Sequence, residues 1–205
     1  ALRNQKRTHI VIATSLFAIA VALFFAAAFY LRTASAHDVV FGGSIIRFTG
    51  VDAYWHIHII DNLSHNFPHL NKIDPYLFYP GGSVTSTGHP FFDYLIAFVI
   101  WVIGLGSPTQ HTVDMIAPYF PPIMAALTII PVYFIGKTVF SRWVGVIAAG
   151  LVAILPGEFL GRSILGFTDH HVAETLFSTT AVMFVLLALK NAKKSEITWS
   201  QIKHP

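Results

Sequence analysis

The chain has 205 residues, of which 54% are hydrophobic and only 11% are charged, and its net charge is +3. This composition is too apolar for a soluble domain of this size and indicates a membrane protein. The absence of cysteine excludes disulfides and thiolate metal sites. The basic residues lie in short clusters beside apolar runs, which indicates membrane orientation and no nucleic-acid partner.

Four largely uncharged stretches predict membrane-spanning helices, which need roughly 17 to 25 mostly apolar residues. The predicted spans are about residues 8–31, 115–136, 143–160 and 172–190. The first stretch has a longer apolar core than a signal peptide, whose core runs about 7 to 15 residues, so we interpret it as an anchor. The sequence therefore predicts an all-α polytopic membrane protein that reads as one domain.

Basic residues gather at one end of the predicted spans and indicate their orientation. The clusters are Arg3, Lys6 and Arg7, then Lys137 and Arg142, then Lys190, Lys193 and Lys194. Cytoplasmic segments of membrane proteins carry an excess of Lys and Arg. Both ends of the chain are then cytoplasmic, and residues 32–114 and 158–171 form two external loops.

The apolar stretch 94–106 is short for a span and ends in a glycine-rich turn before Pro108. If this stretch crossed the membrane, Asp169 would lie on the opposite side from Asp52. We therefore predict that it is a re-entrant or interfacial segment of the long first external loop.

Asp52 is the first candidate for chemistry. Apolar residues follow it at helical spacing, at Ala53, Ile57, Ile60 and Leu63 or Ser64, so Asp52 should lie at or just before the start of an amphipathic helix. The alternative is that Asp52 only caps this helix, since Asp is a favoured capping residue.

The segment Thr168-Asp169-His170-His171 is the second candidate, at the start of the last predicted span. A carboxylate and two imidazoles within three residues can reach one ion, and Asp and His suit a divalent metal. Capping of the last helix by Thr168 or Asp169, with Glu174 completing a capping box, is the alternative.

Arg162 lies ahead of this segment, between Gly161 and Ser163. A surface anchor at the end of a span is the ordinary interpretation of such a residue. The functional interpretation is a fixed positive charge that faces a phosphate or pyrophosphate.

Most histidines lie in the predicted first external loop, at positions 56, 58, 65, 69, 89 and 111, and none lies inside a span. This placement argues against haem ligation between helices. We expect surface or interface roles for most of them, with His89, in Thr87-Gly88-His89-Pro90, near the site.

Several of these segments together resemble the N-terminal transmembrane part of the catalytic subunit of oligosaccharyltransferase, of the archaeal single-subunit type. The supporting segments are Gly50-Val51-Asp52, His65-Asn66-Phe67-Pro68, Asp74-Pro75 and Tyr79-Pro80-Gly81-Gly82-Ser83. The longest and most specific is residues 156–171, Pro-Gly-Glu-Phe-Leu-Gly-Arg-Ser-Ile-Leu-Gly-Phe-Thr-Asp-His-His.

The resemblance implies a membrane glycosyltransferase fold of the GT-C type, in which residues 1–205 are the N-terminal part of the transmembrane domain. It also implies a multi-pass protein of the cell membrane whose active face lies outside, or on the lumenal side in a eukaryote. The implied partners are a lipid-linked oligosaccharide, an acceptor protein with an Asn-X-Ser/Thr sequon and membrane lipids, with no nucleic acid.

The implied reaction transfers an oligosaccharide from a polyprenyl (dolichyl) phosphate or pyrophosphate to the Asn of the sequon. Asp52, Asp169 and His171 match the family's ligands of a divalent metal, Mn or Mg, and Asp52 also contacts the acceptor amide. Arg162 matches a basic residue of catalysis and lipid-phosphate binding, to which His170 and His89 are expected to contribute.

The family pattern also includes further spans, an external-loop glutamate and a Trp-Trp-Asp motif, none of which occurs in these 205 residues. We therefore expect this segment alone to be inactive. Two alternatives remain, another membrane glycosyltransferase that uses lipid-phosphate sugars, and an inactive structural subunit with the same fold.

Overall fold

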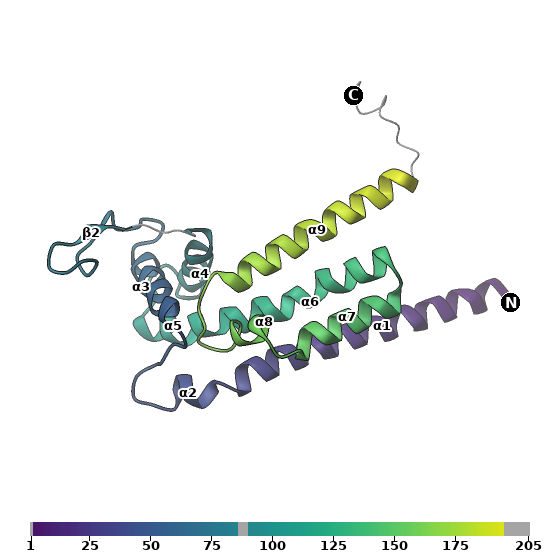
Figure 1. Cartoon of the computed structure of the whole chain (residues 1–205), viewed down its shortest axis with the longest axis horizontal. Coiled ribbons are helices and arrows are strands. Elements are labelled where there is room, and N and C mark those ends of the chain that lie inside the picture. Colours follow the sequence, from purple (N-terminus) through teal and green to yellow (C-terminus); the bar gives the residue numbers. More distant parts are fainter. Residues whose placement is uncertain (1, 86–89, 195–205) are drawn as a thin grey trace, which may run out of the picture. The chain divides into compact units, whose positions relative to one another are not determined.

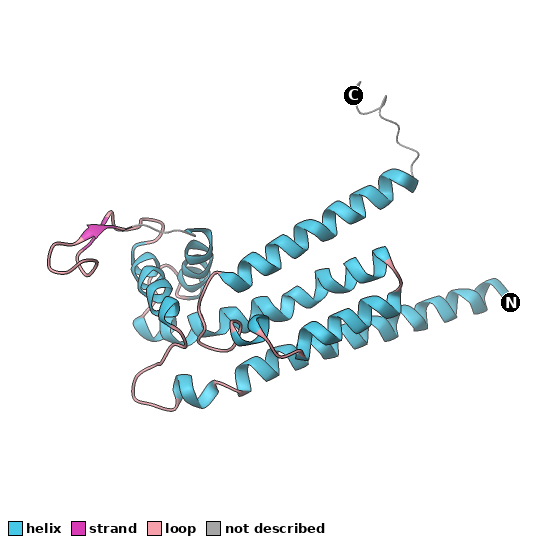
Figure 2. Cartoon of the chain, viewed as in Figure 1, coloured by secondary structure: helices cyan, strands magenta, loops and turns pink. Residues whose placement is uncertain are grey.

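The computed structural model describes residues 2–85 and 90–194, and these are mostly helical (Figures 1 and 2). They form two compact units. The bundle unit contains residues 2–30, 125–156 and 174–194, and the loop unit contains residues 31–124 and 157–173.

The helices are α1 (Leu2–Ala34), α2 (His37–Phe41), α3 (Val51–Asn66), α4 (Pro90–Ile103), α5 (Gln110–Ile116), the 3-10 helix η1 (Ala117–Tyr119), α6 (Phe120–Val139), α7 (Arg142–Ile154), α8 (Glu158–Gly161) and α9 (His171–Lys194). Two short strands, β1 (Ile73–Asp74) and β2 (Ser83–Val84), pair antiparallel in the loop after α3.

Three helical stretches are long and apolar enough to cross a membrane. They are Val11–Ala34, Gln110–Val139 and His171–Lys193, and each overlaps a span predicted from the sequence. Membrane-spanning helices are therefore supported at three of the four predicted positions.

The predicted span 143–160 is wrong in its extent, because α7 already ends at Ile154. A residue before proline is sterically biased away from the helical region, and Leu155, which precedes Pro156, has φ −65° and ψ 124°. Gly157 follows with φ 146°, and α8 is a separate turn of helix. The α7 helix is thus a shorter apolar helix.

Small residues bring the backbones of α6 and α7 together in the bundle unit. A Cβ atom added to Gly136 would lie 2.8 Å from the Gly145 Cα, and one added to Gly145 would lie 2.6 Å from the Tyr133 carbonyl oxygen. Close helix contact through small residues is typical of membrane helices. The core around this contact is alanine-rich and includes Ala126, Ala149 and Ala153.

In the loop unit, α3 packs against α4 through Ile59, Leu63 and Ala97. The predicted apolar stripe of α3 is largely confirmed, because Ala53, Ile60, Leu63 and Ser64 are buried. Ile57 was wrongly placed in it, since it is only half-buried, and His56 and Ile59 complete the buried face instead. The α4 helix has 14 residues, which is short for a span.

Arg32, near the end of α1, anchors the segment that follows α8. Its side chain is fully buried, its Nε donates to the Ser163 Oγ at 2.8 Å, and its carbonyl accepts from the Leu165 N–H at 2.9 Å. The guanidinium carbon also lies 5.4 Å from the centre of the Phe159 ring. The loop that leads to Asp169 is therefore held by a buried polar contact.

Candidate metal centre

The loop from Gly166 to Asp169 is fixed by backbone contacts on both sides. Gly166 has φ 82°, its N–H donates to the Pro118 carbonyl at 3.0 Å, and its carbonyl accepts from the Thr49 N–H at 2.9 Å. A Cβ at Gly166 would come within 2.7 Å of the Val40 Cγ2, so this position requires glycine both for its backbone and for space.

Thr168 and Asp169 follow directly, and both are fully buried. The Thr168 hydroxyl donates to the Ala117 carbonyl at 3.3 Å. The Asp169 Oδ1 accepts from the N–H of His170, the residue immediately before α9, at 2.6 Å. The loop therefore delivers one buried carboxylate to the start of the last helix.

Two histidines meet this carboxylate at its Oδ1 atom. The Nδ1 of His170 lies 2.7 Å from Oδ1, and the Nε2 of His56, which comes from α3, lies 3.3 Å from it. The two imidazoles are also within 3.1 Å of one another, from His56 Nε2 to His170 Nδ1. These three residues offer ligand atoms that all lie within 4.8 Å of one another.

The other ring nitrogen of His56 contacts a second buried carboxylate. Its Nδ1 lies 2.7 Å from the Oδ1 of Asp93, which belongs to the first turn of α4. The exposed fractions of His56 and Asp93 are only 4% and 1%. His56 therefore lies between two acidic side chains, with Asp93 on one side and Asp169 on the other.

Two carboxylates around one imidazole shift the pKa values of the group. Burial opposes the charge of His56, but hydrogen bonds and charge from Asp169 and Asp93 raise its pKa to about 9. Burial likewise opposes ionisation of Asp169, yet the hydrogen bond to His56 and the charges of His171 and His170 hold its pKa below the ordinary value. The centre thus favours an ionised Asp169.

The second oxygen of Asp169 is the observation that fits a metal ion. Asp169 Oδ2 is buried and accepts no hydrogen bond, although a buried carboxylate oxygen without a partner is costly. The Nε2 of His171 lies 3.4 Å from it. A carboxylate oxygen and an imidazole nitrogen side by side are suitable first ligands for a divalent cation.

Asp52 lies at the start of α3, as the sequence predicted, but the capping alternative is wrong. The N-cap residue is Gly50, with φ 93°, and no side chain caps this helix end. Asp52 is exposed. Among the described residues it does not join the groups whose ligand atoms lie within metal-binding distance of one another.

Arg162 interacts electrostatically with both acidic positions, Asp52 and Asp169. Its Nε donates to the Glu158 Oε2 at 2.8 Å, which raises its pKa most, and the charges of Asp169 and Asp52 raise it further. The guanidinium carbon lies 6.0 Å from the centre of the Phe167 ring. His89 lies outside the described residues.

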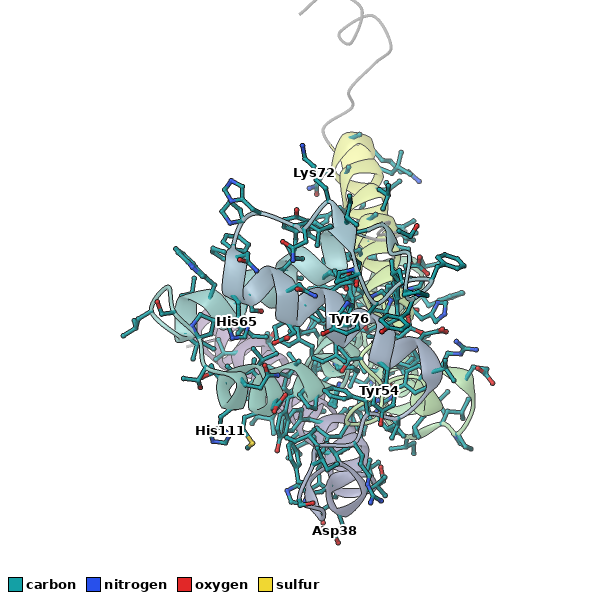
Figure 3. All side chains as sticks on the ribbon, turned by 90° about the vertical axis from the view of Figure 1, so that its left-hand side faces the viewer. Asp38, Tyr54, His65, Lys72, Tyr76 and His111 are labelled. Carbon is teal, nitrogen blue, oxygen red and sulfur yellow. The ribbon has the colours of Figure 1, made fainter. Side chains whose placement is uncertain are left out.

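Sequence reasoning missed His56 and Asp93 as parts of this centre. The signal for His56 was its spacing, because a residue four positions after Asp52 lies on the same helix face. Asp93 carried a weaker signal, as an acidic residue at the start of an apolar stretch. Figure 3 labels six side chains of the loop unit, all of them exposed, whereas His56, Asp93 and Asp169 are buried.

Residues 12–203 match the protein family described as "Oligosaccharyl transferase STT3, N-terminal". A dolichyl-phosphooligosaccharide-protein glycotransferase 3 of Archaeoglobus fulgidus is 39% identical over 155 residues, which are 75% of this chain and 17% of that protein. The dolichyl-monophosphooligosaccharide–protein glycotransferase AglB of Haloferax volcanii is 32% identical over 82% of this chain and 16% of its own length.

Solved structures of the Archaeoglobus fulgidus oligosaccharyltransferase also resemble the chain. Its complex with an inhibitory peptide and a dolichol-phosphate matches 93% of this chain and 22% of that one, with 33% identity and a TM-score of 0.79. Its complex with Zn and sulfate matches 90% of this chain and 23% of that one, with 35% identity and a TM-score of 0.76.

The chain spans about a fifth of the length of these relatives or less. The family match nevertheless covers nearly all of it, including both acidic segments predicted from the sequence. The chain therefore belongs to the STT3 family of oligosaccharyl transferases, whose N-terminal region it matches.

Proposed function

We propose that this chain takes part in protein N-glycosylation, the transfer of an oligosaccharide from a dolichyl or other polyprenyl phosphate or pyrophosphate to the Asn of an Asn-X-Ser/Thr sequon. The observation that carries the proposal is the buried Asp169, whose Oδ2 lacks a hydrogen bond and faces His171. The archaeal relatives are named for dolichyl-linked oligosaccharide transfer to protein. One related structure holds an acceptor peptide with a sequon.

Asp52, Asp169 and His171 would hold a divalent ion in this proposal, with Mn or Mg as the expected metal. Two carboxylates and one imidazole are a donor set suited to such ions. A related structure was obtained with Zn, which supports a divalent site without fixing the metal used in the cell. When bound, the ion would stabilise negative charge on the leaving phosphate.

Asp52 has a second task, because an amide nitrogen is a poor nucleophile. Its carboxylate is exposed at the start of α3 and is not used as a helix cap, so it is available to accept a hydrogen bond from the acceptor Asn. A carboxylate near a helix N-terminus stays ionised. We therefore assign two roles to Asp52. It orients the acceptor Asn by a hydrogen bond, and it is one of the ligands of the divalent ion.

Arg162 provides the positive charge for the lipid phosphate. Its side chain is 45% exposed and, within the described part of the chain, its ion pair is with the more exposed Glu158, so a phosphate can compete for the guanidinium. Guanidinium groups recognise phosphate oxygens by paired hydrogen bonds. His170 and His89 are the further residues we assign to the lipid phosphate.

The proposed topology has four spans, of which the 13-residue α7 is the shortest, with residues 32–114 and 158–171 on the outer face. The similarly short segment 94–106 does not cross, because a crossing there would move the basic residues Lys137 and Arg142 to the outside. Cysteines placed at the exposed positions Tyr79 and Phe140 test it. Impermeant maleimide added outside should label the first and spare the second. Labelling of both positions from one side would mean that α4 crosses the membrane.

A transfer assay with a fluorescent sequon peptide and lipid-linked oligosaccharide tests the function. Because the relatives are much longer than this chain, we expect residues 1–205 alone to be inactive, and the assay uses the protein as it occurs in the cell. Asp52→Ala and Asp169→Ala should each lower the rate by about 100-fold or more. The fully exposed carboxylate of Asp38 provides the control Asp38→Ala, which should leave the rate unchanged.

Two other outcomes would replace the proposal. Transfer of sugar to an acceptor without a sequon would indicate another glycosyltransferase that uses lipid-phosphate sugars. Absence of any transfer by the wild-type protein, with normal assembly into a membrane complex, would indicate a structural subunit.

A further inference from the structure

Two buried side chains of the centre have no role in the proposed function. They come from different helices. His56 belongs to the second turn of α3 and Asp93 to the first turn of α4. Their contact, 2.7 Å from His56 Nδ1 to Asp93 Oδ1, is buried and lies at the packed face of these two helices. The other ring nitrogen of His56, Nε2, lies 3.3 Å from Asp169 Oδ1, so His56 connects the α3–α4 pair to the loop that carries Asp169.

The two oxygens of Asp169 are used in different ways. Oδ1 faces three nitrogens, the backbone N–H of His170 at 2.6 Å, the Nδ1 of His170 at 2.7 Å and the Nε2 of His56 at 3.3 Å. Oδ2 accepts no hydrogen bond. The carboxyl group is therefore held at one oxygen, and the orientation that results leaves the other for His171 and a cation.

We propose that Asp93 and His56 are positioning residues, which fix the rotation of the Asp169 carboxylate so that Oδ2 is presented to the divalent ion beside His171. This inference rests on the proposed metal centre and identifies the residues that hold its Asp169 ligand in place. Side chains that hydrogen-bond to a metal ligand without touching the metal orient that ligand, and their loss typically lowers metal affinity by about 10- to 100-fold.

A cation bound directly by His56, Asp169 and His170 is the competing arrangement, and one of its three ligand separations disfavours it. Octahedral bonds of about 2.0–2.1 Å, as Mg²⁺ requires, would place neighbouring ligand atoms roughly 2.9 Å apart. His170 Nδ1 and Asp169 Oδ1 are only 2.7 Å apart, a hydrogen-bond distance. His56 and His170 thus act on Oδ1 as hydrogen-bond partners.

The experiment measures Mn²⁺ affinity of the purified full protein by electron paramagnetic resonance, with no substrate present. Asp93→Leu, which removes the acceptor of His56, and His56→Phe, which keeps a ring without nitrogen, should each weaken Mn²⁺ binding by about 10- to 100-fold. Asp93→Asn keeps an acceptor oxygen for the His56 N–H and should restore most of the affinity.

A matched control separates positioning from simple loss of packing. Leu63→Ala removes a buried side chain from the same α3–α4 contact and leaves the side chains of Asp93, His56 and Asp169 unchanged. It should lower the melting temperature at least as much as Asp93→Leu while keeping Mn²⁺ affinity. Equal loss of Mn²⁺ affinity in Leu63→Ala and Asp93→Leu would reduce the pair to a structural role and overturn the inference.

The remaining outcomes distinguish this inference from the proposed function. If Asp169→Ala abolishes Mn²⁺ binding while His56→Phe and Asp93→Leu bind as the wild type does, the metal centre stands and the positioning role fails. If the wild-type protein binds no Mn²⁺ at all, the metal centre itself is wrong and the inference falls with it. A gain of affinity in His56→Phe would also contradict the assignment.

Discussion

The bundle unit and the loop unit are both helical, but they bury different kinds of side chain. Nine polar or charged residues are buried among those described, and only Thr128 belongs to the bundle unit. The other eight, Arg32, His56, Ser64, Asp74, Asp93, Ser163, Thr168 and Asp169, belong to the loop unit. The bundle unit instead packs alanine and aromatic side chains, with close backbone contacts at glycine.

This difference shows where the chain accepts an energetic cost. Burying a polar group is unfavourable unless it is hydrogen-bonded, and burying a charge requires a partner. In the loop unit the partners are present for Arg32, His56 and Asp93, while one oxygen of Asp169 has none. The buried Asp61 Oδ1 and Thr85 Oγ1 of the loop unit also lack a hydrogen bond, but Asp169 Oδ2 is the unsatisfied oxygen that lies among buried charged partners. Such a concentration of costly groups is expected at a functional centre.

The largest expected effect of a single change in the loop unit is at Arg32. Arg32→Ala removes a fully buried side chain together with its bond to Ser163, and large-to-small changes of this kind cost about 2–5 kcal/mol. We expect a lower melting temperature in detergent and faster hydrogen exchange at the Leu165 amide, which bonds to the Arg32 carbonyl.

Arg32→Met is the matched variant, because it keeps an unbranched side chain of similar length without the guanidinium. It should lose less stability than Arg32→Ala but should still release the Ser163 side chain. Equal and small losses in both variants would show that this buried arginine does not hold the loop, and would weaken the contrast between the two units.

Gly136 provides the corresponding test of the bundle unit, with a smaller expected effect. A Cβ at this position would meet the backbone of Gly145 at 2.8 Å, so α6 and α7 must separate. Gly136→Ala should therefore cost about 1–3 kcal/mol, measured by thermal unfolding in detergent.

Gly161 gives the control for this change, since a Cβ there meets nothing within 4 Å. Gly161→Ala should be neutral or should stabilise by up to about 1 kcal/mol through the unfolded chain. A stable Gly136→Ala protein would mean that close backbone contact is not what holds the bundle unit.

Much of this fold could be predicted from the sequence, because long apolar stretches and their charged flanks have one physical explanation. Val11–Ala34 and His171–Lys193 are apolar by composition alone. The end of α7 was predicted too late, since the bias that Pro156 imposes on Leu155 was given less weight than continuous hydrophobicity.

The sequence singled out Asp169, His170 and His171, which are adjacent in the chain, and Asp52 as a further metal ligand, although Asp52 does not join the ligand groups of the described residues. The contribution of His56 and Asp93 depends on how α3 packs on α4, and the sequence around each residue does not predict that contact. The histidines of the first external loop were expected at the surface or interface, and this holds for the exposed His65 and fails for the buried His56. His56 differs from His65 by its packing against α4, and spacing along one helix does not predict such a tertiary contact.

Asp74 provides the smallest expected effect, and a test in the loop unit away from the candidate centre. Its carboxylate is buried, accepts from the Tyr76 N–H at 2.9 Å and contacts the Nε2 of His58, which ties the β1 segment to α3. Burial opposes ionisation of Asp74, but the hydrogen bonds from Tyr76 and His58 hold its pKa below the ordinary value.

The sign of the pH dependence follows from this lowered pKa. An aspartate whose pKa is lower in the folded state stabilises fully above its unfolded value of about 3.9, and this contribution is lost as the pH falls through the folded value. Exchange of the Tyr76 amide, corrected for its intrinsic pH dependence, should therefore accelerate as the pH falls below about 4. Asp74→Ala, which removes the acceptor, should accelerate it already at neutral pH, by the equivalent of about 0.5–1.5 kcal/mol for one hydrogen bond. Asp38→Ala, at a fully exposed carboxylate, should leave it unchanged. If the Tyr76 amide is as well protected in Asp74→Ala as in the wild type, the contact between β1 and α3 depends on its apolar neighbours alone, and buried polar contacts hold the loop unit only around Asp169.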